Sequence, residues 1–176
     1  MRHRGFSLIE LMIGLALAVI LILLAAPNYA IWTADAQIRN GVESIAAGLR
    51  FAHAEAIKRN AAVEFILDPT TATGGWQVNV VVGVGVVQTA SFAEAATRVD
   101  YTVTPAGATT VTFTGMGAIA ANADASATLT EIAATHAGTV ADTRPLTVLV
   151  GGGRSGIKIC DPAIADTTSP RFCTAA

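Results

Sequence analysis

Gly5-Phe6-Ser7-Leu8-Ile9-Glu10-Leu11 is the stretch that decides how this chain is built. It follows a short basic leader that contains Arg2 and Arg4, and it opens an apolar segment in which residues 11–34 carry no formal charge. As a helix, these 24 residues would span roughly 36 Å, enough to cross a hydrocarbon core of about 30 Å. The sequence therefore predicts a helix that can cross a membrane.

The apolar segment has two interpretations, a permanent anchor and a cleaved secretory signal. The arginines before it leave the N-terminus in the cytoplasm and send the remainder outward, by the positive-inside rule. A cleaved signal needs a small-x-small site after its apolar core, and Ala25-Ala26-Pro27 is a poor one. Glu10 also favours the anchor, because a carboxylate at the mouth of the segment is costly to insert and brings nothing to export. We expect an anchor, with the cleaved signal as the alternative.

The opening stretch resembles the class III leader of type IV prepilins and type II secretion pseudopilins, in which Gly-Phe precedes Thr/Ser-Leu-Ile/Val-Glu-Leu/Met. The resemblance implies that a prepilin peptidase cuts between Gly5 and Phe6 on the cytoplasmic side and then N-methylates Phe6. The helix would stay on the mature protein as a single-pass inner-membrane anchor, with the globular domain in the periplasm. The protein would later enter a pilus or pseudopilus fibre.

The same resemblance gives Glu10 a role in assembly. In these families the corresponding glutamate is thought to pair with the methylated N-terminal amine of a neighbouring subunit. Inside a fibre the two groups would neutralise each other in a dry core, where an unpaired charge is costly. The alternative is a glutamate at the membrane boundary that reaches headgroup water.

Composition bounds the remainder of the molecule. The chain has 176 residues, enough for the anchor and one domain of modest size, and it is 52% apolar and only 14% charged. Without Arg2 and Arg4, 9 of the 11 basic side chains remain against 13 acidic ones, a net charge of −4. Overall charge therefore does not point to nucleic acid.

Cys160 and Cys173 are the two cysteines, with 12 residues between them near the C-terminus. They lie in a part of the chain expected outside the cytoplasm, where disulfides form. Closing a loop of that size stabilises by roughly 3 kcal/mol in the chain-entropy model. The spacing does not fit a redox CxxC motif or a zinc site, and we expect a structural disulfide.

Phe6 to about Arg59 is predicted to form one long helix that Pro27 bends. Its second half, residues 35–60, carries an apolar stripe at steps of four and three, the expected seam for a sheet. Asp35, Arg39 and Glu43 lie off that stripe at i, i+4 spacing, where they can pair on a wet face. The stripe consists of Ile38, Val42, Ile45, Leu49, Ala52 and Ala56.

Beyond Asn60, which closes the helix, apolar residues recur with period two, and this predicts short strands. A helix followed by strands predicts an α+β class, here a pilin-like fold in which a meandering antiparallel sheet covers the stripe. The expected parts are a leader (1–5), a transmembrane and assembly segment (6–34), an amphipathic helical segment (35–60) and a β-rich periplasmic domain (61–176). Strands are expected at 63–67, 76–82, 99–103, 111–113 and about 129–132, with a closing hairpin of 146–150 and 157–160.

The body of the chain narrows the resemblance to the GspH/FimT group of minor pilins and pseudopilins. Residues 49–63 are similar to the group's L-x-x-A-R-x-E-A-I-x-R-N-x-x-V signature, with His53 where the group usually has arginine. Val111-Thr112-Phe113 and Leu146-Thr147-Val148, with Gly153-Arg154 after the latter, are similar to its later strands and its Gly-Arg turn.

No catalytic constellation is found in the sequence. His3 would be lost with the leader, and His53 and His136 have no cysteine or carboxylate at ligand spacing apart from Glu55, which at i+2 from His53 points elsewhere on the helix. The glycine-rich 151–156 segment follows no P-loop template. Within the signature, Glu55 and Arg59 are an i, i+4 pair that we interpret as structural. We expect no enzyme activity, no metal and no cofactor.

A basic site in the C-terminal segment is a weaker hypothesis. It would consist of Arg154, Lys158 and Arg171, and some FimT-type minor pilins are implicated in DNA uptake through basic residues after the Gly-Arg turn. Asp161 and Asp166 dilute this patch, and phosphate binding needs local positive charge. A solvated hairpin with ordinary surface charges is the favoured interpretation.

Three functional hypotheses follow. The first is a minor pilin of a type IV pilus, acting in pilus priming, twitching or DNA uptake, which the C-terminal cysteine pair mildly favours. The second is a minor pseudopilin of type II secretion, similar to protein H. The third is a membrane-tethered binding domain that never assembles. For the first two, the expected partners are other pilins, prepilin peptidase, the inner-membrane assembly platform and membrane lipid.

Overall fold

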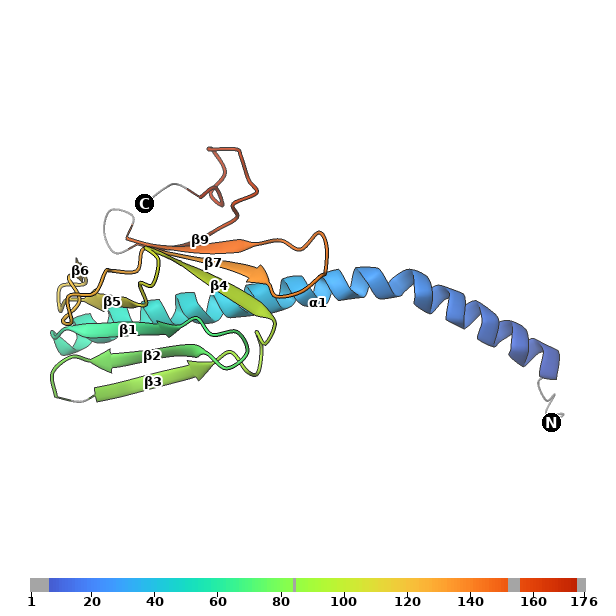
Figure 1. The fold of residues 1–176 in the computed structure, drawn as a ribbon, viewed down its shortest axis with the longest axis horizontal. Coiled ribbons are helices and arrows are strands. Elements are labelled where there is room, and N and C mark those ends of the chain that lie inside the picture. The colour runs from blue at the N-terminus through green and yellow to red at the C-terminus, as the bar shows by residue number, and fades with distance from the viewer. Residues whose placement is uncertain (1–6, 84, 152–155, 174–176) are drawn as a thin grey trace.

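The computed structural model describes residues 7–83, 85–151 and 156–173. One long helix, α1 (Leu8–Arg59), extends far beyond the domain at its N-terminal end, and its second half lies against two antiparallel sheets (Figure 1). The α+β class expected from the sequence is confirmed.

The helix α1 has 52 residues and runs through Pro27 without interruption, with a curved N-terminal part (Figure 1). The predicted helix is thus confirmed from Leu8 onward. It ends at Asn60, as expected. That residue adopts the left-handed conformation (φ 50°, ψ 41°) and donates its backbone N–H to the carbonyls of Ala56 and Ile57. Asparagine tolerates this conformation better than most residues, so it suits a helix end.

Burial divides α1 into two parts. Every described side chain from Leu8 to Ala30 is exposed, whereas Ala34 is only 2% exposed. From there on, the six residues of the predicted apolar stripe are fully buried against the sheets. We call the exposed part, residues 8–33, the stem; the part from Ala34 to Arg59 is the spine of the domain.

The strands form two sheets, not the single meander that was expected. The chain makes β4 in the second sheet before β5 returns beside β1 in the first. Alternation identifies a strand but not its neighbour, so the sequence could not separate the sheets. The first sheet has the order β3 (Gly85–Ser91), β2 (Gly75–Val80), β1 (Val63–Asp68), β5 (Thr110–Phe113), β6 (Ile119–Ala120); the second has β4 (Val99–Thr104), β7 (Glu131–His136), β8 (Leu146–Val150), β9 (Ile157–Cys160).

The predicted strands are present, with differences in their bounds and in the turns between them. The strand expected near 129–132 is β7, which begins at Glu131, because Leu129 instead bonds Thr110 through its backbone N–H. The strand β3 follows a turn in which Gly83 and Gly85 both have positive φ (104° and 74°). It is not among the strands expected from the sequence.

Gly48 lets the first sheet approach the spine closely. A Cβ atom on Gly48 would lie 2.7 Å from Trp76 Cδ2 and 2.8 Å from Phe65 Cε2, so only glycine fits beneath these rings. The indole Nε1 of Trp76 also donates to Ser44 Oγ at 2.9 Å. The first sheet is therefore anchored on α1 one turn before Gly48.

Candidate assembly stem and C-terminal loop

The stem is an apolar helix with nothing from its own domain around it. Its large apolar side chains run from Leu8, 77% exposed, to Leu24, 68% exposed. Among the described residues, one helix, α1, is both long enough and apolar enough to cross a membrane, by length and composition. Gly5 and Phe6, the expected processing residues, lie outside the described residues.

Glu10 is exposed in the first turn of α1, surrounded along the helix by apolar residues. No ion pair joins it to any other residue in the described part of the chain. An acidic group in the first turn interacts favourably with the helix dipole. Its carboxylate is thus open to a cation from outside the described chain.

The signature at the end of α1 is a structural ion-pair cluster, as predicted. Glu55 accepts from Arg59 Nε at 2.6 Å and from Lys58 Nζ at 2.9 Å, and its side chain is only 9% exposed. Hydrogen bonds from Arg59, and then from Lys58, hold the pKa of Glu55 below its usual 4.5. His53, where the group usually has arginine, packs edge-on against Phe113 with ring centroids 5.5 Å apart.

At the start of the spine, Asp35 makes a contact that its sequence spacing did not indicate. Its Oδ1 accepts the backbone N–H of Arg144 at 2.8 Å, which joins the β7–β8 loop to α1. No ion pair links Asp35, Arg39 and Glu43 among the described residues. An exposed ion pair contributes little to stability, because two long side chains must be ordered to form it. The backbone N–H of Arg144, which Asp35 binds instead, is already fixed in the loop.

The predicted disulfide between Cys160 and Cys173 is present, and it closes the C-terminal segment onto β9. Two of the three candidate basic residues take part in holding this loop. Lys158 Nζ donates to the Phe172 carbonyl at 2.8 Å, and Arg171 Nη2 lies 3.7 Å from Asp161 Oδ2. Arg154 lies outside the described residues. Lys158 and Arg171 are thus brought to one loop, but each has a partner there.

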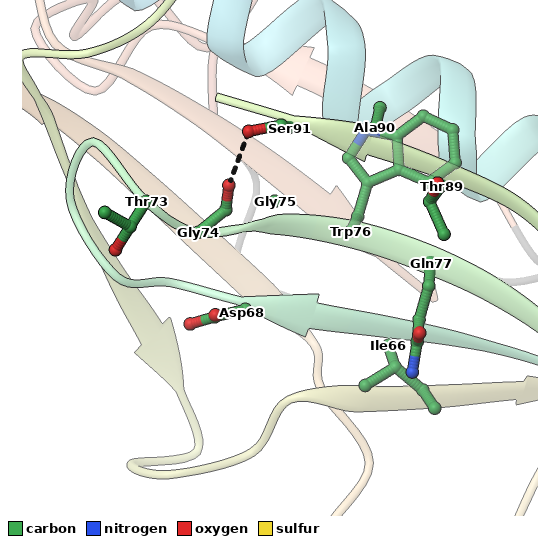
Figure 2. A pocket seen from close by; sticks show the side chains of 10 residues that line it. All are labelled: Ile66, Asp68, Thr73, Gly74, Gly75, Trp76, Gln77, Thr89, Ala90 and Ser91. Atoms are coloured by element: carbon green, nitrogen blue, oxygen red, sulfur yellow. Dashed lines mark hydrogen bonds between the residues drawn. The ribbon is translucent and has the colours of Figure 1, made fainter. Parts of the chain in front are cut away.

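A hollow of about 400 Å³ lies on the face of the first sheet that points away from α1 (Figure 2). Gly74 and Gly75, which have no side chains, line the hollow between Asp68 and Ser91. The Ser91 Oγ donates to the Gly74 carbonyl at 3.5 Å. The Thr70 hydroxyl and backbone N–H bond the Asp68 carboxylate and lower its pKa. Within the described ranges, no three His, Cys, Asp or Glu side chains gather as metal ligands would. Asp68 is the one charged side chain among the described residues that line the hollow.

Comparisons with known proteins agree with these features. Residues 1–26 match the prokaryotic N-terminal methylation motif, and residues 41–153 match the family model of the type II transport protein GspH. A similar solved structure is that of the type IV minor pilin FimU from Pseudomonas aeruginosa (strain PAO1). Its sequence identity is 17% and its TM-score 0.49, over 72% of this chain and 92% of that chain. No curated protein matches the sequence.

A stem that continues into the spine of a β-rich domain, together with a methylation motif at its start, defines a pilin-like protein. The GspH model covers more than half of the chain, and the chain belongs to the GspH family. It is a minor pilin or pseudopilin, as the sequence resemblance indicated. Proteins of these families are structural subunits, and membership implies assembly with other pilins and processing by prepilin peptidase.

Proposed function

We propose that the protein is a minor pilin of a type IV pilus-type fibre, held in the inner membrane by its stem until it assembles. The N-terminus would face the cytoplasm and the domain the periplasm. The observation that carries this proposal is the exposed stem, whose apolar side chains are not buried by their own domain. Such a surface needs lipid around it before assembly and neighbouring helices around it afterwards.

Processing completes the stem in this proposal. Cleavage between Gly5 and Phe6 would place a methylated amine one helical turn before Glu10. A carboxylate among apolar side chains needs a cation once water is excluded, and the amine of a neighbouring stem supplies one. The pairing would set the axial register between neighbouring stems.

A pseudopilin of type II secretion is the second candidate, and the description of the matching family favours it. The disulfide-closed C-terminal loop favours the pilus, where such loops are frequent. A gene deletion scored in parallel for twitching, transformation and exoprotein release separates the two. We expect twitching or transformation to fail with release intact. Failure of release alone would assign the protein to secretion.

Assembly itself is tested by cross-linking between stems. Single cysteines at Leu17 and Leu24 would be exposed on the stem, and a cysteine at Ala47, exposed on the spine, is the matched control. The native cysteines do not interfere because they are bonded to each other. Disulfides between neighbours at the stem positions are expected in cells that make the fibre. A tethered domain that never assembles would give none.

DNA uptake is a further role that the C-terminal loop leaves to experiment. Lys158 and Arg171 already have partners within the loop, which supports a structural role for them. A gel-shift titration of the protein against DNA, with Arg154→Ala plus Lys158→Ala as the comparison, tests the alternative. We expect no salt-sensitive binding; a shift that the double variant abolishes would establish a DNA site.

A further inference from the structure

Two aromatic side chains stand exposed at the end of the stem. Tyr29 and Trp32 are each 66% exposed, and their rings lie 6.0 Å apart on one side of α1. Both rings combine an apolar body with a polar tip. Such side chains concentrate where a membrane meets water.

The position of Tyr29 and Trp32 along α1 fits the boundary between membrane and water. At about 1.5 Å per residue, Tyr29 lies roughly 31 Å and Trp32 roughly 36 Å from Leu8, close to the hydrocarbon thickness of about 30 Å. Ala34 is already covered by the domain, being 2% exposed. No spacer therefore separates the aromatic pair from the domain.

The β7–β8 loop, residues 137–145, lies beside α1 at the end of the domain nearest the stem (Figure 1). Its Arg144 is fixed through its backbone N–H to Asp35, one turn beyond Trp32. The Arg144 side chain is exposed and makes no ion pair or hydrogen bond among the described residues. The backbone of an exposed arginine is thus held against α1 one turn beyond Trp32.

We propose that Tyr29, Trp32 and Arg144 form a collar that seats the unassembled domain directly on the phospholipid headgroups of the outer leaflet. The two rings lie at the hydrocarbon boundary and the Arg144 guanidinium binds a headgroup phosphate, for which its planar donors are suited. Asp35, which accepts the Arg144 backbone N–H, and Asp142, two residues before Arg144, carry opposite charge, so the proposed contact is with a phosphate group and not with net negative membrane charge. This inference rests on the proposed membrane anchoring by the stem.

The depth of Trp32 gives the first test. The chain has two tryptophans, and Trp76, a residue of β2, is buried, so Trp32→Phe leaves a background signal. The full-length protein is incorporated into phosphatidylcholine vesicles whose acyl chains carry bromine either near the headgroup or near the bilayer centre. We expect shallow bromine to quench the wild type more than deep bromine does, and neither to quench Trp32→Phe.

Flotation of the same vesicles separates a failure of the proposed collar from a failure of the proposed membrane anchoring. Protein that floats with vesicles while Trp32 is unquenched, or is quenched more by deep bromine, would overturn the collar and leave the anchoring intact. Protein that does not float at all would overturn both.

Arg144 is tested through the position of its loop. A nitroxide attached to Ala141→Cys reports the depth of the β7–β8 loop. The label reacts with this cysteine alone, because the two native cysteines are bonded to each other. We expect the label at headgroup level, moving into water in Arg144→Ala and staying in place in Arg50→Ala, an exposed arginine further along the spine. A label in bulk water from the outset, or one held only when another pilin subunit is added, would show that the loop does not bind lipid.

Discussion

Replacing Gly41 with alanine tests how the second sheet is seated on α1. Gly41 is buried in the spine directly beneath Tyr101 of β4, and an added Cβ would overlap the Tyr101 hydroxyl oxygen. The Tyr101 ring cannot move away freely because it packs on Phe92, with centroids 4.6 Å apart. Alanine gains about 1 kcal/mol in helix propensity, while overpacking a core costs about 1–3 kcal/mol. We expect a net loss of up to about 2 kcal/mol in the free energy of unfolding.

The Tyr101 hydroxyl explains why a second substitution should reverse this loss. It is buried and finds no hydrogen-bond partner in the described part of the chain, and burial raises its pKa. Removing a buried polar group that lacks a partner is close to neutral or stabilising. Tyr101→Phe should therefore change stability by less than about 1 kcal/mol. In that background Gly41→Ala should cost about 1–2 kcal/mol less than in the wild type.

The assay is guanidinium unfolding of the full chain in detergent, followed by tryptophan fluorescence, in which the buried Trp76 reports the loss of the core. Gly14→Ala is the matched control, because an added Cβ there meets nothing within 4 Å. Full additivity of Gly41→Ala and Tyr101→Phe would refute the reasoning, since it would mean that the Tyr101 hydroxyl does not occupy the space above Gly41.

Two further predictions concern the disulfide and the ion-pair cluster. Replacing Cys160 and Cys173 with serine should lower the unfolding free energy by about 3 kcal/mol, from the loop that the bond closes; added reductant should mimic the change in the wild type. Glu55 has its pKa lowered by Arg59 and Lys58, so its stabilising contribution is complete above about pH 4.5 and is lost as the pH falls through the lowered pKa. The stability difference between wild type and Glu55→Gln should therefore shrink on acidification below about pH 4.5, in denaturant titrations at each pH; a constant difference would contradict this.

The sequence was most informative where structure depends on neighbouring residues. The apolar run and the stripe that follows it lie along one helix, and Asn60 marks its end, so the helix was predicted from Phe6 to about Arg59; the structure describes it from Leu8. The predicted bounds of β7 were two residues too early at its start, because its alanine-rich sequence gives little contrast between buried and exposed positions. The division into two sheets was missed because pairing between distant strands has no local pattern.

The same division applies to the candidate site. The stem and the Glu55 cluster follow from spacing along one helix, and the disulfide follows from the two cysteines alone. The bond from Arg144 to Asp35 joins residues 109 positions apart, and no local spacing could indicate it. Likewise, the carbonyl that Lys158 bonds belongs to Phe172, which only the folded C-terminal loop brings near.

Intact-mass analysis of the protein purified from its native membrane tests most directly whether the stem is trimmed at its inner end and kept. The account predicts a single species that begins at Phe6, carries one added methyl group and retains every later residue. A chain that begins at Met1, or one that has lost the whole stem to signal cleavage, would contradict it.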